Sequence, residues 1–231
     1  MPESLLIESL SEFDTPTICN AIELIAPERR THGFTTKPFL CHDPSLPPIV
    51  GYARTATIRA TAPSGRSKAE DLATRIGYFR HIAEAPGPTV TVIEDIDEHV
   101  GFGAHWGEVN SNLHKGLGSV GVITNGSIRD ADMWAEGFGA LAGFYSPSHA
   151  WVHVVDYAIP VTVHGMAVSP GDIIHADRHG AVVVPPSAVT AIADTVKRLE
   201  TAEAKLIEPS QQPEFNVEQL ITILDPDGRD H

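Results

Sequence analysis

Three strand-like runs that alternate with helix-like segments constrain the fold of this chain more than any other feature. Residues 49–60, 89–97 and 120–124 are rich in β-branched and apolar residues, as buried strands are. Between them, residues 67–84 place apolar side chains at helical spacing and end near a Pro-Gly pair, and residues 108–115 predict a second helix. This alternation predicts an α/β domain with its ligand site at the carboxyl ends of the strands.

The flanking segments predict further helices and a group of short strands. Residues 3–12 predict a short amphipathic helix, and Thr15, which precedes a proline, is expected to cap a second helix. Residues 150–184 hold short β-runs separated by turns, which predict a compact antiparallel or mixed layer. A last helix is predicted over residues 187–207, and the acidic, weakly periodic residues 208–231 are expected to form an arm.

Charge and cysteine content narrow the classes of partner and compartment. Sixteen Lys and Arg against thirty Asp and Glu give a formal charge of −14, which argues against nucleic acid or an acidic membrane as a partner. A local arginine can still bind an acidic small substrate in a cleft. Cys19 and Cys41 have no metal-like spacing, so reduced thiols and a cytoplasmic protein are expected. The acidic N-terminus predicts no signal peptide, and no run predicts a membrane span.

Residues 107–130 carry the chemistry. A helix that begins at Glu108 leaves backbone N–H groups free in its first turn, where an anion can bind. The strand over 120–124 and the Asn-Gly turn after it should return Arg129 and Asp130 to the same end of the sheet. We therefore expect one small pocket with an anion hole, a guanidinium group and two carboxylates.

The order of these residues resembles a known family. Glu108 stands twenty residues ahead of the adjacent Arg129 and Asp130, in GEVN…GVITNGSIRD, and a later run reads IPVTVHGMAVSPGDIIHADRHGAVVVPP. Both resemble the family that contains the regulator of ribonuclease E activity A (RraA) and the class II pyruvate aldolases. Those aldolases act on 4-hydroxy-4-methyl-2-oxoglutarate and 4-carboxy-4-hydroxy-2-oxoadipate. The resemblance spans most of residues 15–207.

The resemblance implies a fold and an assembly. Length alone fits one large domain or two small ones. The family implies a single RraA-like α/β/β/α layered domain over residues 1–231, with a mixed sheet, a short-stranded C-terminal β layer and a C-terminal helix. Residues 1–14 would be an N-terminal helical extension and residues 208–231 an acidic arm. A homotrimer or homohexamer with sites between subunits is expected.

It also implies a metal site. Mg²⁺ or Mn²⁺ would be held directly by Asp130 and otherwise by water, which suits a hard cation. Glu108 would hold a metal-bound water that shuttles the proton. A Glu on the C-terminal helix of a neighbouring subunit would complete the site; Glu203 is our candidate, with Glu200 and Glu208 as alternatives.

The substrate side of the pocket follows from the same resemblance. Arg129 would bind the carboxylate and keto oxygen of a pyruvate-like group, and the amides of Val109 and Asn110 the same carboxylate. The implied reaction is metal-dependent carbon–carbon lysis of a 4-hydroxy-4-substituted 2-oxo diacid to pyruvate through a metal-stabilised enolate, with oxaloacetate decarboxylation. Lys115 lies on the predicted helix away from the loop, which argues against a Schiff base.

The group attached to the pyruvate is not given by these motifs. We expect His149 to line the pocket and to help choose the substrate. Ala104, His105 and Asn125 are further candidates for shaping the leaving-group side.

Simpler interpretations stand beside these. Glu108 fits a helix-start acid, and Arg129 with Asp130 fits a solvated pair. The four-residue spacings within His149/His153 and His175/His179 invite a metal site, but they fall in strand and turn sequence, where structural histidines are commoner. Two other functions remain: a non-catalytic RraA-type regulator that binds a ribonuclease, and a cupin-like oxygenase or isomerase, for which a second histidine motif is missing.

Overall fold

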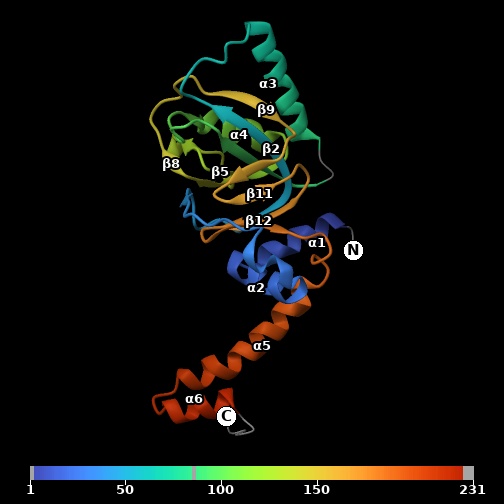
Figure 1. The fold of residues 1–231 in the computed structure, drawn as a ribbon, viewed down its shortest axis with the longest axis vertical. Coiled ribbons are helices and arrows are strands. Elements are labelled where there is room, and N and C mark those ends of the chain that lie inside the picture. The colour runs from blue at the N-terminus through green and yellow to red at the C-terminus, as the bar shows by residue number, and fades with distance from the viewer. Residues whose placement is uncertain (1–2, 85–86, 226–231) are drawn as a thin grey trace.

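A mixed eight-stranded sheet forms the centre of the protein (Figure 1). The computed structural model describes residues 3–84 and 87–225. The strand order is β1-β7-β5-β3-β2-β12-β13, with β9 paired to the far end of β2. The strands are β1 Leu40–Cys41, β2 Ile49–Arg59, β3 Thr89–Asp95, β5 Ser119–Thr124, β7 Gly139–Ala142, β9 His153–Tyr157, β12 Ile173–Asp177 and β13 Gly180–Val184.

The parallel part of the sheet is the part that the sequence predicts. Strands β2, β3, β5 and β7 run parallel, with Ala56 opposite Ile93 and Ile93 opposite Thr124. Most of their residues are buried, which explains their nearly continuous apolar sequence. The crossovers contain α3 (Lys68–Ala83), whose first turn is closed by a Ser67/Glu70 capping box, and α4 (Glu108–Gly116).

The C-terminal strands divide between the sheet and a separate hairpin. We expected residues 150–184 to form a layer of their own, yet β12 pairs antiparallel with β2 and carries β13 beside it. On its other side β2 approaches the start of β3 closely at Gly51, where a Cβ would lie 2.5 Å from the carbonyl oxygen of Pro88. Only the hairpin of β10 (Val161–Val163) and β11 (Met166–Val168) lies over the sheet.

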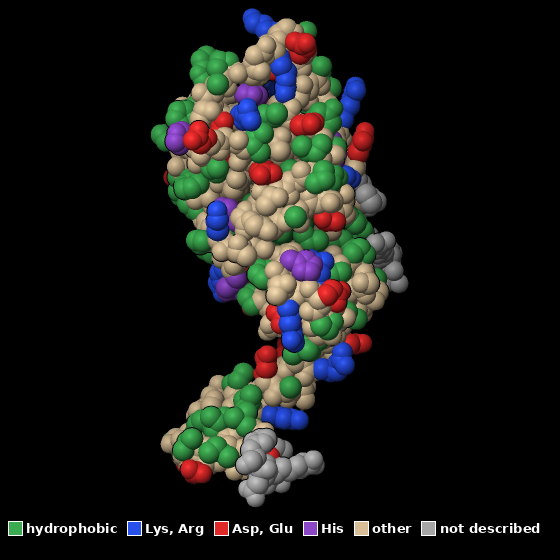
Figure 2. Space-filling view, in the orientation of Figure 1, with side chains coloured by type: hydrophobic (Ala, Val, Ile, Leu, Met, Phe, Trp, Pro, Cys, Tyr) green, Lys and Arg blue, Asp and Glu red, His purple; other side chains and the backbone are tan. Residues whose placement is uncertain are grey.

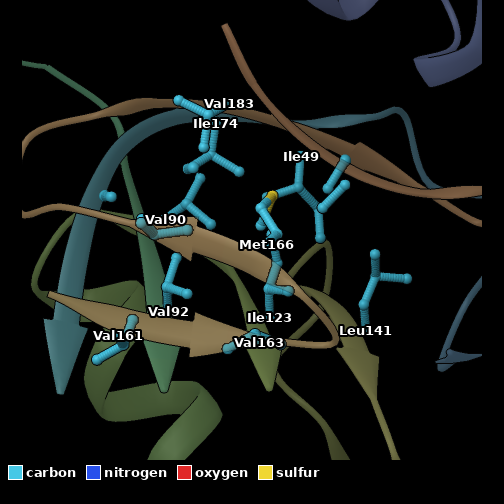
Figure 3. Close-up of a cluster of buried hydrophobic side chains, with 14 residues drawn as sticks. Ile49, Val90, Val92, Ile123, Leu141, Val161, Val163, Met166, Ile174 and Val183 are labelled. Atoms are coloured by element: carbon cyan, nitrogen blue, oxygen red, sulfur yellow. The ribbon is translucent and has the colours of Figure 1, made fainter. Parts of the chain in front are cut away.

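The hairpin and the sheet enclose one core. Figure 3 shows Val161, Val163 and Met166 of the hairpin facing Val92 and Ile123 of the sheet, and all five are almost fully buried. Each such side chain contributes roughly 1.5–3 kcal/mol through its burial. On the opposite side, Tyr78 and Ile82 of α3 pack against the sheet in a second cluster of buried apolar side chains. The α/β fold with a mixed sheet and a short-stranded β layer is therefore confirmed.

Three short parallel strands extend the carboxyl ends of the main sheet. They are β4 (Ala104–Trp106), β6 (Ser127–Ile128) and β8 (Phe144–Tyr145), in the order β4-β6-β8. Each follows a parallel strand of the main sheet along the chain, namely β3, β5 and β7. This small sheet fixes the segments that immediately precede α4 and the Arg129-Asp130 pair.

The N-terminal helices pack on the end of the sheet that β12 and β13 form. They are α1 (Glu3–Ser9), the 3-10 turn η1 (Leu10–Glu12) and α2 (Thr15–Ile25), followed by the 3-10 turn η2 (Pro27–Thr31). The N-cap of α2 is Asp14, which accepts from the Thr17 amide at 2.8 Å, so our assignment of Thr15 as the cap is wrong. The Thr15 amide donates instead to Asp177 at 2.9 Å.

A two-helix arm leaves the body of the protein (Figure 1). Helix α5 (Ile192–Ser210) begins five residues later than predicted from residue 187 and packs its buried Ile192 and Val196 against α2. Its outer half and α6 (Val217–Leu224) project away, and Figure 2 shows apolar side chains gathered on this arm. Helix α6 was not predicted. The end of the predicted acidic arm, residues 226–231, lies outside the described residues.

Two further features bear on the sequence predictions. Cys19 and Cys41 are both free thiols. Within residues 3–84 and 87–225, no helix has both the length and the apolar character that crossing a bilayer requires.

Candidate functional site

A pocket of about 480 Å³ lies between α3, the start of α4, and the segments that carry Arg129 and His149. This volume is in the range of small-molecule sites. The lining residues are Asp71, Thr74, Arg75, Tyr78, Phe79, His105, Gly107, Val109, Asn110, Arg129, Asp130, His149, Val152, His153 and Val154.

The first turn of α4 supplies backbone donors to this pocket. Gly107 is the N-cap, and its carbonyl accepts from Ser111 at 3.0 Å. The amides of Val109 and Asn110 fall in the turn where a helix offers no carbonyl partner. Val109 is 65% exposed and lines the pocket, as Asn110 does. The positive end of the helix dipole adds to these amides, so the turn favours an anion.

Arg129 and Asp130 are held at the pocket by backbone contacts. The Arg129 amide donates to the Trp106 carbonyl at 2.9 Å, and its carbonyl accepts from the Trp134 indole at 2.8 Å. Asp130 has φ of 53°, in the left-handed region, which Asp and Asn tolerate better than most residues. Its Oδ2 lies 3.3 Å from Arg129 Nε and 3.4 Å from the Glu108 amide.

Gly107 leaves room for this carboxylate. A Cβ at residue 107 would lie 2.5 Å from Asp130 Oδ2 and 3.1 Å from Arg129 Cγ. Because the φ of Gly107 is −176°, the requirement for glycine is one of space and not of backbone conformation. The start of α4 and the Arg129-Asp130 pair therefore meet as closely as the sequence spacing suggested.

The side chains of Glu108 and of the three C-terminal glutamates lie outside the pocket wall, unlike those of the other predicted site residues Val109, Asn110, Arg129, Asp130 and His149. The Glu108 amide reaches Asp130, but its side chain is exposed and is not part of the pocket wall. Glu200, Glu203 and Glu208 are exposed on the arm of α5, which Figure 1 shows pointing away from the pocket-bearing body. Within one chain, none of these three lines the pocket.

The donor set fits a hydrated hard cation. Asp130 contributes one carboxylate, whose side chain is 30% exposed, at the pocket wall. Mg²⁺ commonly binds through one or two carboxylates and keeps several waters. Among the residues that the structure describes, no group of three or more His, Cys, Asp or Glu side chains is arranged to hold a metal. A site that relies on protein ligands alone, as zinc sites do, does not fit these residues.

The two histidine pairs differ in their surroundings. His175 is fully buried; its Nδ1 accepts from the Thr15 hydroxyl at 3.0 Å, and its Nε2 donates to the Leu10 carbonyl at 3.1 Å. His179 pairs with Asp177 at 3.1 Å. These two are structural, as the simpler interpretation held. His149 and His153 both line the pocket, and His153 Nδ1 donates to the Trp151 carbonyl at 2.8 Å.

Two of the candidates for the leaving-group side lie elsewhere. The Asn125 side chain accepts from the Asp95 amide at 2.8 Å and donates to the Asp95 carbonyl at 2.9 Å. This reciprocal pair joins the ends of β3 and β5, and neither Asn125 nor Ala104 is part of the pocket wall. His105 does line it.

A buried hydrogen-bond chain supports the first turn of α4. The Tyr78 hydroxyl donates to His114 Nε2 at 2.6 Å, and His114 Nδ1 donates to the Asn110 carbonyl at 2.6 Å. The Asn110 amide side chain in turn donates to the His105 carbonyl. Sequence reasoning missed this chain of hydrogen bonds, although Tyr78 and His114 belong to helices that the sequence predicted.

His105 and His114, the two histidines of this hydrogen-bond network, are neutral at pH 7. Burial lowers the pKa of His114 from 6.5 to about 4, partly offset by its bond to the Asn110 carbonyl. Burial also lowers the pKa of His105 to about 3, with further lowering by Coulombic interactions with His114, Arg75 and His149. In the neutral ring one nitrogen donates and the other accepts, so with Nδ1 donating to the Asn110 carbonyl, Nε2 accepts from the Tyr78 hydroxyl.

Acid should therefore destabilise the protein through His114. Above pH 6.5 the ring is neutral in both states; between pH 6.5 and about 4 only the unfolded chain binds the proton, so stability falls as pH falls. His114 alone should remove about 2 kcal/mol between pH 7 and pH 5. Urea unfolding of the wild type and of His114→Gln at both pH values checks this. An equal loss in the variant would contradict it.

Fold and pocket together define an α/β protein with a carboxylate and an anion-binding helix start at the carboxyl ends of its parallel strands. The chain belongs to the RraA-like family: the model described as Aldolase/RraA matches residues 15–183. This family includes both aldolases and inhibitors of ribonuclease E.

Individual relatives agree with this assignment. The chain is 30% identical over 119 residues to an uncharacterized protein of Methanocaldococcus jannaschii, and the match covers 49% of this chain and 57% of that protein. It therefore spans little more than half the length of this curated relative. A Streptomyces coelicolor structure, described as an unusual member of the RNase ES inhibitor RraA protein family, has a TM-score of 0.66 and 25% identity, covering 87% of this chain and 95% of that one.

A third comparison supports the fold alone. An uncharacterized protein from Pseudomonas syringae pv. tomato superposes with a TM-score of 0.69 at 17% identity, covering 94% of this chain and 93% of that chain.

Proposed function

We propose that this protein is a divalent-metal-dependent lyase that cleaves a 4-hydroxy-4-substituted 2-oxo diacid and releases pyruvate, and that it also decarboxylates oxaloacetate. The observation that carries the proposal is the meeting, in one pocket, of the first-turn amides of α4 with Arg129 and Asp130. A regulator that only binds protein surfaces has no need of this arrangement.

The 2-oxo acid end of the substrate fits the start of α4. Its carboxylate would accept from the amides of Val109 and Asn110, where the helix has no other partner for them. Arg129 offers a planar pair of donors to the carboxylate and keto oxygen, and its charge favours the enolate that forms when the carbon–carbon bond breaks. Two hydrogen bonds hold the backbone of Arg129, and the contact of its Nε with Asp130 Oδ2 directs the side chain toward this part of the pocket.

Asp130 would hold Mg²⁺ or Mn²⁺ together with water. When bound, the metal supplies Lewis acidity to the keto oxygen of the substrate. Asp130 Oδ2 is already engaged by Arg129 and the Glu108 amide, which orients the carboxylate. Oδ1 makes no hydrogen bond or ion pair within the described part of the chain, so it is available to a ligand.

Proton transfer is assigned to a water held by Glu108. Removal of the proton from the 4-hydroxyl turns C4 into a carbonyl carbon as the C3–C4 bond breaks, and the electron pair passes to the pyruvate enolate. Return of one proton to C3 then gives pyruvate. In oxaloacetate the same bond breaks with loss of CO₂. The Glu108 side chain is exposed, and only its backbone amide lies near Asp130 Oδ2, which suits a role through water better than direct contact.

Assembly would complete the site. The arm of α5 extends its glutamates beyond the body of one chain, as a contribution to a neighbour's pocket requires. We therefore propose a homotrimer or homohexamer in which Glu203, or its neighbours Glu200 or Glu208, approaches the next pocket.

A coupled assay tests the proposed function. Purified protein with Mg²⁺ or Mn²⁺ should release pyruvate from oxaloacetate and from 4-hydroxy-4-methyl-2-oxoglutarate faster than metal alone. Excess chelator should stop release, and added Mg²⁺ should restore it. Release that persists unchanged after metal removal would contradict the metal-dependent mechanism.

The alternative is a non-catalytic regulator of a ribonuclease. It is favoured by the similarity to the Streptomyces coelicolor RraA-family structure at 25% identity over 87% of this chain. Inertness toward both 2-oxo acids, with and without metal, together with direct binding to a purified ribonuclease E-type enzyme, would support the regulator over the lyase.

A further inference from the structure

Arg75 is a cation in the pocket that the steps above do not use. It lies on α3, across the helical turn from Phe79, and both residues line the pocket. Its Cζ lies 5.7 Å from the centre of the Phe79 ring, a cation–π contact that holds the guanidinium without satisfying its donors.

The guanidinium of Arg75 makes no ion pair or hydrogen bond to any described residue. Asp71, one turn earlier, is engaged elsewhere: it lies 3.7 Å from Arg66 and accepts from the Ser64 hydroxyl at 2.8 Å. In a chain with a formal charge of −14, a pocket arginine left without a carboxylate is available to an anionic ligand.

The surroundings of Arg75 favour an anion there. His105 contributes no competing negative charge, and the positive charge of Arg75 is among the causes that lower the pKa of His105. His149 and His153, on the segment that also lines the pocket, offer ring nitrogens and no carboxylate. Arg129, by contrast, shares its part of the pocket with Asp130.

We propose that Arg75 binds the second carboxylate of the substrate, and that it therefore selects 2-oxo acids whose distal end is anionic. This inference rests on the proposed function for the position of the 2-oxo acid end at Arg129 and the first turn of α4. It deepens that function by defining the leaving fragment, which carries its own carboxylate to the α3 side of the pocket.

Binding without turnover tests this directly. 2-Oxoglutarate has the 2-oxo acid end and a distal carboxylate but lacks the 4-hydroxyl, so it is not cleaved by a retro-aldol step. Calorimetry on the full chain with Mg²⁺ should show Arg75→Gln weakening 2-oxoglutarate about 10- to 100-fold, the size expected for one charge-assisted contact. Pyruvate, which has no distal carboxylate, should bind Arg75→Gln within about twofold of the wild type.

Arg80→Gln is the matched control, because Arg80 is an exposed arginine on the same helix and is not in the pocket wall. It should leave the affinity for both ligands unchanged. Arg75→Lys keeps a positive charge without the planar fork, and it should give an intermediate loss for 2-oxoglutarate. This second variant also serves if Arg75→Gln does not fold.

Equal weakening of pyruvate and 2-oxoglutarate in Arg75→Gln, or no weakening of either, would overturn the assignment of Arg75. Failure of the proposed function gives a different result: the wild type would release no pyruvate from hydroxylated 2-oxo diacids, whatever the preference of Arg75 in binding.

Discussion

Replacing Asp130 with asparagine is expected to lower metal-dependent pyruvate release about 10³-fold, because the variant loses the charge that holds the cation whose Lewis acidity is worth several kcal/mol. Asparagine is the informative substitution here. It keeps the size of the side chain and tolerates the left-handed backbone of Asp130, whose φ is 53°. Alanine at this φ would add strain to the loss of charge.

Two measurements accompany this variant. Mn²⁺ titration followed by electron paramagnetic resonance should show weakened binding in Asp130→Asn, in parallel with the loss of pyruvate release. Asp132→Asn is the control, since Asp132 is an exposed acid two residues away, in the 3-10 turn η3 (Ala131–Met133), and outside the pocket wall. Full Mg²⁺-dependent activity in Asp130→Asn would remove Asp130 from the metal site.

Replacing Arg129 with lysine is expected to reduce kcat/KM for oxaloacetate about 10²-fold, although the positive charge is kept. A lysine ammonium is a point charge and cannot offer the two parallel donors that a carboxylate and keto oxygen accept together. The backbone bonds of residue 129 to Trp106 and Trp134 do not depend on the side chain, so the variant should fold.

Steady-state kinetics with Mg²⁺ and far-ultraviolet circular dichroism check this prediction. The matched control is Arg178→Lys, in the exposed turn between β12 and β13, and it should keep wild-type kinetics. If Arg129→Lys also retained wild-type kinetics, a bidentate role for Arg129 would be untenable.

The parallel sheet was predictable because its signals are local. Residues 49–60, 89–97 and 120–124 are rich in β-branched and apolar residues, and they are observed as β2, β3 and β5 with bounds within about two residues. The helix over 67–84 is bounded by a capping box and a Pro-Gly stop, so α3 was equally clear. The convergence of α4 with Arg129 and Asp130 followed from chain direction alone.

The features that were missed depend on tertiary contacts. Strands β12 and β13 look like any short β-run, and only pairing with β2 places them in the main sheet. Asp14 caps α2 by accepting from the Thr17 amide, while the Thr15 amide donates to Asp177, a contact that is far away in sequence. Arg75 has the pattern of a solvent-facing residue of an amphipathic helix and is exposed in the structure, and only the fold shows that it also lines the pocket.

The histidines also show that sequence alone does not give tertiary surroundings. Spacing cannot distinguish His149, which lines the pocket, from His175, which braces the N-terminal helices from inside the core. The role of His175 depends on its surroundings in the fold, which are formed by β2, β12 and the N-terminal segment together.

The small sheet of β4, β6 and β8 supports the site through its main chain and depends little on which side chains its outer strand carries. Its strands pair through main-chain contacts, and the last of them presents Phe144 and Tyr145 to solvent, 49% and 54% exposed. Substitutions at these two positions remove none of the main-chain contacts through which the strand that precedes Arg129 is paired. The outer strand is a tolerant edge where directed evolution can introduce new surface chemistry without dismantling the pocket behind it.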